Sequence, residues 1–515
     1  MRKSNLVIVY HRQPYEEIVE NGKVVYREHA SPNGIVPTLK SFFGTVDQGA
    51  WVAWKQIDSK EQKTFERVVR IRDSYGEYNV SRLPLTPQQV RSFYHVTSKE
   101  ALWPILHSFP EKYNYDPVDW EAFREVNLLF AKAAVEEAAP NAVIWVHDYN
   151  LWLVPLYVRQ LRPDVRIAFF HHTPFPEPSI FNILPWRDEI TESLLSCDLV
   201  GFHIPRYAMS FVSTARSLKK VEILEEVDVD GRVSQHGMAL SVPKVATRIA
   251  YEGRDIAIDS FPVGTNADYI AALCNADSTL AREREIRDAL GDRKFIISVG
   301  RSDYTKGIRD MLLAYERLLK RRPELIEKIQ LLVTSVSANA GMTVYRNVQR
   351  EIEQIAGRIN GKHATFSWQP IVLFTTAIPF EELVAYYRCA DICWITPLRD
   401  GLNLVAKEYV AARGDLASGV LVLSEFTGAA VGMPTAVMAN PYSNRNMDAA
   451  IDQALDMPAS EQAERLAVML EKVREYDSSR WAQHTIERFQ ELCNRPSRVA
   501  GARPAAAKRH HPQSA

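Results

Sequence analysis

The sequence predicts an α/β protein made of two doubly wound domains that face each other across a cleft. Short apolar runs alternate with helical patterns almost throughout, which is typical of parallel sheets covered by helices. The chain has 515 residues, more than one compact core normally holds. The apolar runs fall into two series, and Pro262 and Gly264 in FPVGTN (261–266) form a plausible hinge between them.

The first series predicts the strands of an N-terminal domain that spans residues 1–265. Its runs are short, apolar and bounded by polar segments, as buried strands are. They are LVIVY (6–10), AVIWV (142–146), VRIAFF (165–170), DLVGF (198–202) and IAIDSFPV (256–263).

The second series predicts a C-terminal domain over residues 266–475, with a charged helix at 277–291 ahead of its first strand. Its runs are KFIISVG (294–300), IQLLVTSV (329–336), IVLF (371–374), DICWITP (391–397) and GVLVLS (419–424). We expect residues 476–494 to form a helix that crosses back to the first domain. The Ala-, Pro- and base-rich residues 495–515 predict a disordered tail.

Composition narrows the class of protein. The 62 basic and 63 acidic residues balance, so no nucleic-acid partner is expected. No apolar run approaches the roughly 18 residues of a membrane helix, and the N-terminal run predicts a first strand and not a signal peptide. The five cysteines are scattered, which favours a reducing cytoplasm over a disulfide or zinc framework.

The segment TPLRDGLNLVAKEYVAAR (396–413) carries the strongest functional signal. Asp400-Gly401 follows a strand-like run, and a helix opens directly afterwards. The first N–H groups of such a helix lack internal partners and suit a phosphate. Asp400 and Glu408 then suit sugar hydroxyls, and the combination describes a nucleotide-sugar. The alternative is an ordinary helix start with an acidic residue favoured by the dipole.

Polar residues follow several predicted strands, at the sheet edge where ligands bind in open α/β folds. They are Arg12, His147, Asp148, His171, His172, Arg301 and Asp400. If strand alternation continues, one of the two adjacent histidines points into the cleft and the other away from it.

Arg301 and Lys306 in VGRSDYTKG (299–307) put two cations on one turn, which suits a leaving diphosphate. Surface solubility is the alternative explanation. No G-x-G-x-x-G after a strand, no P-loop and no G-x-S-x-G motif occurs, so dinucleotide, P-loop and serine-hydrolase functions are disfavoured.

The segment VDVDGR (227–232) predicts a hairpin turn at Asp230-Gly231. It also matches an Asp-x-Asp pattern that binds metal–diphosphate in some transferases. Because a hairpin already accounts for it, we expect no metal site and no cofactor.

Six motifs together resemble the trehalose-6-phosphate synthase group, glycosyltransferase family 20, over roughly residues 5–490. They are YHVTSKEALWPILH (94–107), IWVHDYNL (144–151), FFHHTPFP (169–176), VGRSDYTKG, AGRING (356–361) and TPLRDGLNLVAKEYVAA (396–412). The resemblance implies two Rossmann-like domains in the GT-B arrangement. It also implies transfer of glucose from a nucleotide donor to a sugar phosphate, with retention and without a required metal.

The resemblance also implies roles for individual residues. Donor binding falls to Gly34, Arg301, Lys306, Asp400, Leu404, Val405 and Glu408. Acceptor binding falls to Arg12, Tyr94, Trp103 and Asp148. Asp148, His172, Arg301 and Lys306 are the expected catalytic residues.

Three departures from the family pattern bear on the acceptor. Tyr10-His11-Arg12 replaces the usual Ser-Asn-Arg, Asn33-Gly34 replaces paired glycines, and Val336 stands where an acceptor-phosphate arginine usually follows Thr-Ser. These changes are similar to those of the branch that forms glucosylglycerol phosphate from ADP-glucose and glycerol 3-phosphate. That product is an osmoprotectant precursor used in salt tolerance, and a downstream phosphatase is then plausible.

Several alternatives stay open. Trehalose-6-phosphate synthase is the nearest and differs in the acceptor loop. A GT-B phosphorylase would need a lysine-held pyridoxal phosphate, which nothing here marks. A non-catalytic sugar-phosphate sensor is disfavoured because Arg301, Lys306, Asp400 and Glu408 are all present. A double displacement with Asp148 as nucleophile is the alternative to front-face transfer.

Overall fold

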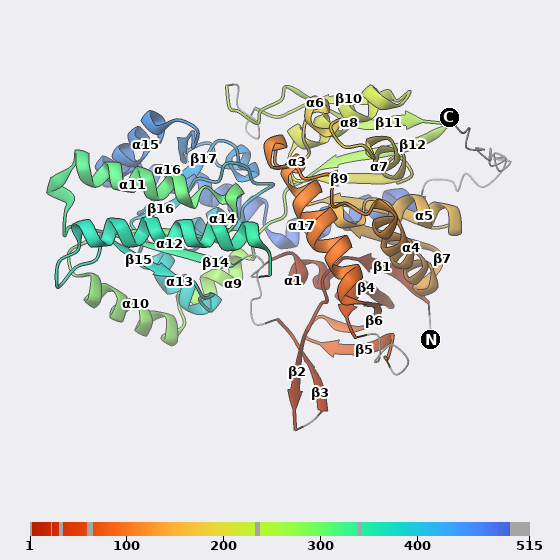
Figure 1. Cartoon of the computed structure of the whole chain (residues 1–515), viewed down its shortest axis with the longest axis horizontal. Helices are drawn as coiled ribbons and strands as arrows, with labels where there is room; N and C mark the ends of the chain where they lie inside the picture. The colour runs from red at the N-terminus through yellow and green to blue at the C-terminus, as the bar shows by residue number, and fades with distance from the viewer. Residues whose placement is uncertain are drawn as a thin grey trace.

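The computed structural model describes residues 3–21, 23–29, 34–58, 65–231, 237–337 and 341–494. The chain forms two α/β halves, each built around its own sheet (Figure 1). This confirms the predicted fold class of two doubly wound domains.

The N-terminal half contains a ten-stranded sheet in the order β10-β11-β12-β9-β8-β7-β1-β4-β6-β5. Its strands are β1 (Ser4–Val9), β4 (Gly49–Gln56), β5 (Val68–Asp73), β6 (Gly76–Leu85), β7 (Ala138–His147), β8 (Arg166–His171), β9 (Leu199–Phe202), β10 (Glu222–Asp228), β11 (Lys244–Tyr251) and β12 (Arg254–Ser260). The central strands are parallel, whereas β5 and the pair β10–β11 extend the edges antiparallel. A separate hairpin of β2 (Glu16–Glu20) and β3 (Lys23–Arg27) projects from the body (Figure 1).

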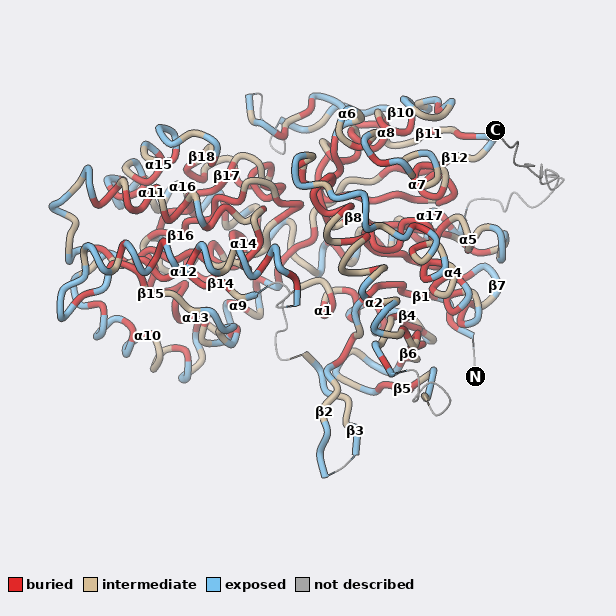
Figure 2. The backbone as a smooth tube through the Cα atoms, in the orientation of Figure 1, coloured by how far each residue is buried: buried red, intermediate tan, exposed pale blue. Residues whose placement is uncertain are grey.

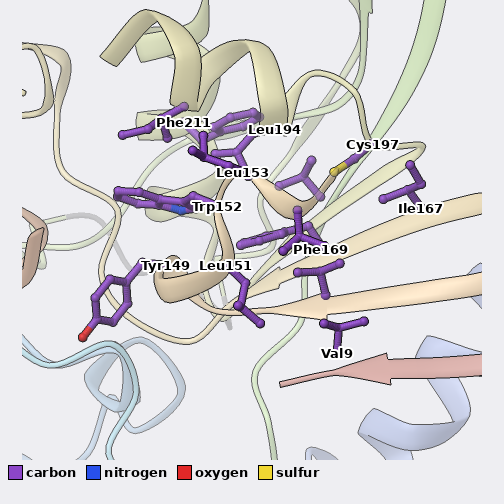
Figure 3. Close-up of a cluster of buried hydrophobic side chains, with 14 of the residues drawn as sticks. Val9, Tyr149, Leu151, Trp152, Leu153, Ile167, Phe169, Leu194, Cys197 and Phe211 are labelled. Carbon is purple, nitrogen blue, oxygen red and sulfur yellow. The ribbon is translucent and has the colours of Figure 1, made fainter. Parts of the chain in front are cut away.

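Helices cover both faces of this sheet. They are α1 (Ile35–Lys40), α2 (Pro87–Val90), a π-helix (Arg91–Leu102), α3 (Trp103–Leu106), α4 (Trp120–Glu137), α5 (Val154–Leu161), α6 (Pro178–Phe181), α7 (Arg187–Leu194) and α8 (Pro205–Leu218). One large core cluster lies between the sheet and the helices α4, α5, α7 and α8, with Trp152, Phe169 and Phe211 fully buried (Figure 3). The ring of Tyr149 extends from the same cluster with its hydroxyl pointing away from it (Figure 3).

The C-terminal half contains a six-stranded, fully parallel sheet in the order β15-β14-β13-β16-β17-β18. Its strands are β13 (Lys294–Ser302), β14 (Ile329–Ser337), β15 (Ile371–Phe374), β16 (Ile392–Ile395), β17 (Val420–Ser424) and β18 (Val437–Ala439). Its helices are α9 (Ala267–Cys274), α10 (Asp277–Leu290), α11 (Ile308–Arg321), α12 (Thr343–His363), α13 (Phe380–Cys389), α14 (Leu404–Arg413), α15 (Asn444–Asp456) and α16 (Ala459–Glu475). Buried segments concentrate in the strands of both sheets, as expected for helices on either face (Figure 2).

The last helix, α17 (Ser478–Asn494), packs on the N-terminal half, as its amphipathic sequence requires. Trp481 is fully buried and contacts Phe42 and Trp145, with ring centroids 5.6 and 5.5 Å away. His484 reaches Asp259 on β12 at 2.8 Å. The chain therefore crosses twice between the halves. The predicted tail 495–515 lies outside the described residues.

All ten predicted apolar runs coincide with strands, but the tight turn at Asp230-Gly231 is wrong. Strands β10 and β11 are antiparallel neighbours, yet Asp228 pairs with Lys244. Residues 229–243 therefore join them, and no two-residue turn does. No helix in the described parts of the chain has the length and apolar character needed to span a membrane.

Candidate active site

A cavity of about 350 Å³ lies between the two halves and is lined by residues from both. It contains most of the residues that the sequence analysis assigned to the site: Arg12, Tyr94, Trp103, Asp148, His172, Arg301, Lys306 and Asp400. Residues separated by up to nearly four hundred positions in the chain thus meet in one place.

Strand order explains how the N-terminal residues meet. Strands β1, β7 and β8 are parallel neighbours, so their carboxyl ends share one edge of the sheet. Arg12, Asp148 and His172 each follow one of these strands and line the cavity from that edge. Arg12 is exposed to solvent, whereas Asp148 is buried.

Asp148 has a strained backbone, with φ 70° and ψ 161°. A non-glycine residue at positive φ costs free energy and is concentrated at functional sites. Its amide donates to the Phe170 carbonyl at 2.9 Å, and its carboxylate accepts from the Tyr149 amide at 3.1 Å. These bonds hold the conformation. Burial raises the pKa of Asp148 to about 6, so the carboxylate is mostly ionised at neutral pH.

The two adjacent histidines point in different directions, as alternation predicted. His172 lines the cavity and lies 3.1 Å from His147, Nε2 to Nδ1. His171 is buried next to Phe175 and Phe202, and its Nδ1 lies 3.1 Å from the Thr173 carbonyl oxygen. Burial lowers the pKa of His172 well below its ordinary value, so His172 is neutral at physiological pH.

The C-terminal wall contains an internal ion pair. Lys306 Nζ lies 2.7 Å from Asp400 Oδ2, and Asn403 Nδ2 donates to the same oxygen at 3.1 Å. Burial alone would raise the pKa of Asp400, but Lys306 outweighs it and lowers that pKa. Arg301 lines the same cavity and forms no ion pair with any described residue. This wall therefore combines a neutralised lysine with an unpaired guanidinium.

The turn at Gly401 brings the two halves into contact. A Cβ on Gly401 would lie 2.3 Å from the carbonyl oxygen of His172, a distance no side chain tolerates. The Tyr207 hydroxyl also donates to the Asp400 carbonyl at 3.0 Å. Asp400-Gly401 is thus fixed against the N-terminal half through its own backbone.

Four predicted donor residues lie outside this cavity. Gly34 and Leu404 line a separate cavity of about 130 Å³ near the start of α14. Val405 packs partly buried in the C-terminal core. Glu408 is buried on α14, where it accepts a bond from the Tyr387 hydroxyl at 3.1 Å. Burial raises the pKa of Glu408 to about 7.

Lys99 is a cavity residue that the sequence analysis missed. It lies on the π-helix between Tyr94 and Trp103, within a motif already identified as informative. In an α-helix, residues five apart do not share a face. The i→i+5 bonding of a π-helix aligns Tyr94 with Lys99, and Ser98 Oγ bonds the Phe93 carbonyl with the same spacing. A signal that could have found Lys99 is its place four residues before Trp103, since residues four apart share a face of an α-helix.

Comparison with known proteins places these residues in a family. The family model of glycosyltransferase family 20 matches residues 4–491. A glucosylglycerol-phosphate synthase of Synechocystis sp. is 55% identical over 94% of this chain and 97% of its own length. A glucosylglycerol-phosphate synthase of Pseudomonas anguilliseptica is 43% identical over 93% of this chain and 64% of its own length.

Solved structures are similar to this chain over nearly its full length. An α,α-trehalose-phosphate synthase (UDP-forming) of Burkholderia xenovorans, in complex with glucose-6-phosphate, has a TM-score of 0.80 at 30% identity, covering 94% of this chain and 99% of its own. An E. coli structure bound with UDP-2-fluoro glucose has a TM-score of 0.80 at 28% identity, covering 95% and 99%. The chain belongs to glycosyltransferase family 20 and is a glycosyltransferase with the GT-B fold.

Proposed function

We propose that this enzyme transfers glucose from ADP-glucose to sn-glycerol 3-phosphate, with retention at the anomeric carbon, and forms glucosylglycerol phosphate. The observation that carries the proposal is the 55% identity, over nearly the full length of both chains, to a glucosylglycerol-phosphate synthase. Identity to trehalose-phosphate synthases is lower, at 33% for that of Pichia angusta.

The acceptor side of the site supports this substrate. Val336 directly follows the buried part of β14 and pairs in register with Arg301 on β13. An apolar side chain here cannot bind the distal phosphate of a bulky sugar phosphate, a role that the resemblance to trehalose-6-phosphate synthases assigns to an arginine at this position. A shorter acceptor brings its phosphate closer to the reacting hydroxyl, where Arg12 lines the cavity.

Charge on the C-terminal wall supports departure of the diphosphate. As the donor bond loosens, negative charge grows on the leaving diphosphate, and Arg301 and Lys306 neutralise it. In the unliganded enzyme Lys306 forms an ion pair with Asp400. When the donor binds, this ion pair breaks and each side chain contacts a different part of the donor. Lys306 then faces phosphate oxygens, and Asp400 accepts from glucose hydroxyls.

Retention requires the acceptor to attack from the face that the diphosphate leaves. In this front-face path the leaving diphosphate takes the proton of the acceptor hydroxyl, and the protein contributes position and electrostatics. Asp148 and His172 orient the transferred glucose and the acceptor. The strained, hydrogen-bonded Asp148 suits a fixed orienting role. A covalent intermediate on Asp148 is the competing mechanism, and trapping with a fluorinated donor analogue distinguishes the two.

A matrix of two donors and two acceptors tests the proposal. ADP-glucose and UDP-glucose are each offered with glycerol 3-phosphate and glucose 6-phosphate, and the products are identified by mass and anomeric configuration. We expect the highest kcat/KM with ADP-glucose and glycerol 3-phosphate, and an α-linked product. A preference for glucose 6-phosphate identifies a trehalose-6-phosphate synthase instead. A phosphatase acting on the product would complete synthesis of an osmoprotectant.

A further inference from the structure

Lys99 faces the cavity without a carboxylate partner. Its ammonium lies 3.9 Å from the ring centroid of Trp103 and 5.7 Å from that of Tyr94, and it forms no ion pair with any described residue. Lys306, in the same cavity, is matched by Asp400 at 2.7 Å. A partly desolvated cation held only by aromatic faces is costly, unless an anion arrives with the substrate.

The surroundings of Lys99 are rich in positive charge. Arg12 lies close to Tyr94, the residue whose ring also faces Lys99. Burial and the nearby Arg301 lower the pKa of Lys99 to about 7, an effect that Asp303 and Asp148 only partly offset. Three cations without an ion-pair partner among the described residues, Lys99, Arg12 and Arg301, therefore line one cavity. A phosphate dianion relieves their repulsion and restores the charged form of Lys99.

Hydrogen-bond donors beside Lys99 also lack partners. Trp103 Nε1, Asn150 Nδ2 and the Tyr149 hydroxyl are buried and unpaired within the described structure, and all three residues line the cavity. Buried donors are rarely left unpaired in native proteins, so such a group needs an explanation. An oxygen-rich ligand seated against Lys99 supplies one.

We propose that Lys99 determines acceptor specificity by binding, together with Arg12, the phosphate of a small phosphomonoester acceptor. In this site Lys99 replaces the cation that is absent at Val336, but from the opposite, N-terminal wall. The inference rests on the proposed function for the identity of the acceptor, glycerol 3-phosphate. It concerns the phosphate of that acceptor and not the donor diphosphate.

Steady-state kinetics of the full-length enzyme at saturating ADP-glucose tests this role. Lys99→Met removes the charge but keeps the apolar stem on Trp103, and Lys99→Arg keeps the charge. Lys112→Met is the matched control, because Lys112 also lies over an aromatic ring, 5.2 Å from Tyr304, but is exposed and does not line the cavity. Inorganic phosphate is used as a competitive inhibitor against the acceptor.

For Lys99→Met, we expect kcat/KM for glycerol 3-phosphate to fall roughly 30- to 1,000-fold, as for truncating one partner of a buried charge pair. The inhibition constant of phosphate should rise at least about tenfold, and KM for ADP-glucose should change less than about threefold. Lys99→Arg should recover most of the loss, and Lys112→Met should behave as wild type. A phosphate-induced rise in melting temperature, present in wild type and lost in Lys99→Gln, gives a reading independent of turnover.

Unchanged acceptor kinetics and unchanged phosphate inhibition in Lys99→Met would refute the inference and leave the proposed function intact. A rise in the KM of ADP-glucose, with acceptor kinetics unaffected, would assign Lys99 to the donor and also refute it. Failure of the proposed function looks different, because the wild-type enzyme then prefers glucose 6-phosphate. Phosphate inhibition still measures the role of Lys99 in that case, since the probe does not depend on the acceptor.

Discussion

The two walls of the cavity treat positive charge in opposite ways. On the C-terminal wall, Lys306 is joined to Asp400 at 2.7 Å, and Asn403 supports the same carboxylate. On the N-terminal wall, Lys99 lies against aromatic rings, and Arg12 lies beside Tyr94. The first wall pairs its lysine directly with a carboxylate, whereas on the second wall Asp148 forms no ion pair with Lys99 or Arg12 in the described structure.

This difference matches the chemistry proposed for each wall. The donor side must bind a diphosphate and also sugar hydroxyls, so an acid and a base side by side serve both needs. The acceptor side must recognise a phosphate and reject neutral polyols, which unpaired cations do well. Removing a charge from one wall should therefore alter different kinetic parameters from removing a charge from the other.

The largest expected effect is on the C-terminal wall. Lys306→Ala or Arg301→Ala should lower kcat by about 10²–10³, because each removes a partner of the charge that develops on the leaving diphosphate. Lys306→Ala also leaves Asp400 buried without its cation. The double variant Lys306→Ala/Asp400→Asn removes that buried charge, so its kcat should be higher than that of Lys306→Ala. Lys320→Ala, which removes an exposed i,i+4 partner of Glu316, is the control and should leave turnover unchanged. Near-normal kcat in both cavity variants would contradict the assignment of this wall to the diphosphate.

Glu408 extends the comparison to a buried carboxylate with no cation beside it. Its folded pKa, about 7, exceeds its ordinary value, so its contribution to stability is present at low pH and is lost as pH rises through 7. Glu408→Gln should therefore stabilise the unliganded enzyme at pH 8, on the order of 2–3 kcal/mol, and have little effect at pH 4.5.

Urea unfolding of wild type and Glu408→Gln from pH 4.5 to 8.5 measures this difference. Because the buried histidines are present in both proteins, their contribution to the pH dependence of the unfolding free energy cancels in the difference. The variant should also bind ADP-glucose more weakly, if the carboxylate accepts from ribose hydroxyls. A constant stability difference across the pH range would show that Glu408 is not the titrating group.

Sequence reasoning predicted the sheets well because each strand's information is local. Ten apolar runs became strands, and parallel order brought Arg12, Asp148 and His172 to one edge. The strands β4 and β6 were not predicted, although β4 pairs with β1 and β6 pairs with β4. The run WVAWKQ in β4 ends in polar residues, and β6 includes a proline and an arginine, so neither has a clear strand pattern.

Pairing between side chains was harder to predict. The ion pair between Lys306 and Asp400 joins two residues that were assigned to separate ligand groups, because sequence spacing does not give the distance between them. Lys99 was missed because the family resemblance supplied only Tyr94 and Trp103 from this motif, although Lys99 lies between them on the π-helix. The ion pair depends on tertiary geometry at the site, where a sequence often departs from ordinary local rules.

Arg12 tests the acceptor wall from its solvent-exposed side. Arg12→Ala should raise KM for glycerol 3-phosphate and lower kcat/KM. The corresponding loss of transition-state stabilisation should be about 1.5–3 kcal/mol, the range for a hydrogen bond to a charged group. Since Arg12 is exposed, we expect the lower end of this range. Arg70→Ala, which removes an exposed ion pair with Glu77, is the control. A loss confined to kcat, with acceptor KM unchanged, would place Arg12 outside the ground-state acceptor site.

The smallest expected effect is that of restoring the arginine that the acceptor loop lacks. Val336 is half-buried and pairs with Arg301 across β14 and β13, so Val336→Arg puts a second guanidinium beside the first. Like charges on neighbouring strands repel, and Arg301 has no ion-pair partner among the described residues that would offset the added charge. The rest of the cavity wall, with Lys99 and Arg12, is unchanged in this variant. We therefore expect Val336→Arg to change kcat/KM for glycerol 3-phosphate less than about threefold and to produce no trehalose phosphate.

Product analysis by mass spectrometry with glucose 6-phosphate as acceptor checks this, with the wild-type enzyme as baseline. Trehalose phosphate formed by the single variant would show that position 336 alone selects the acceptor, and that the N-terminal wall does not.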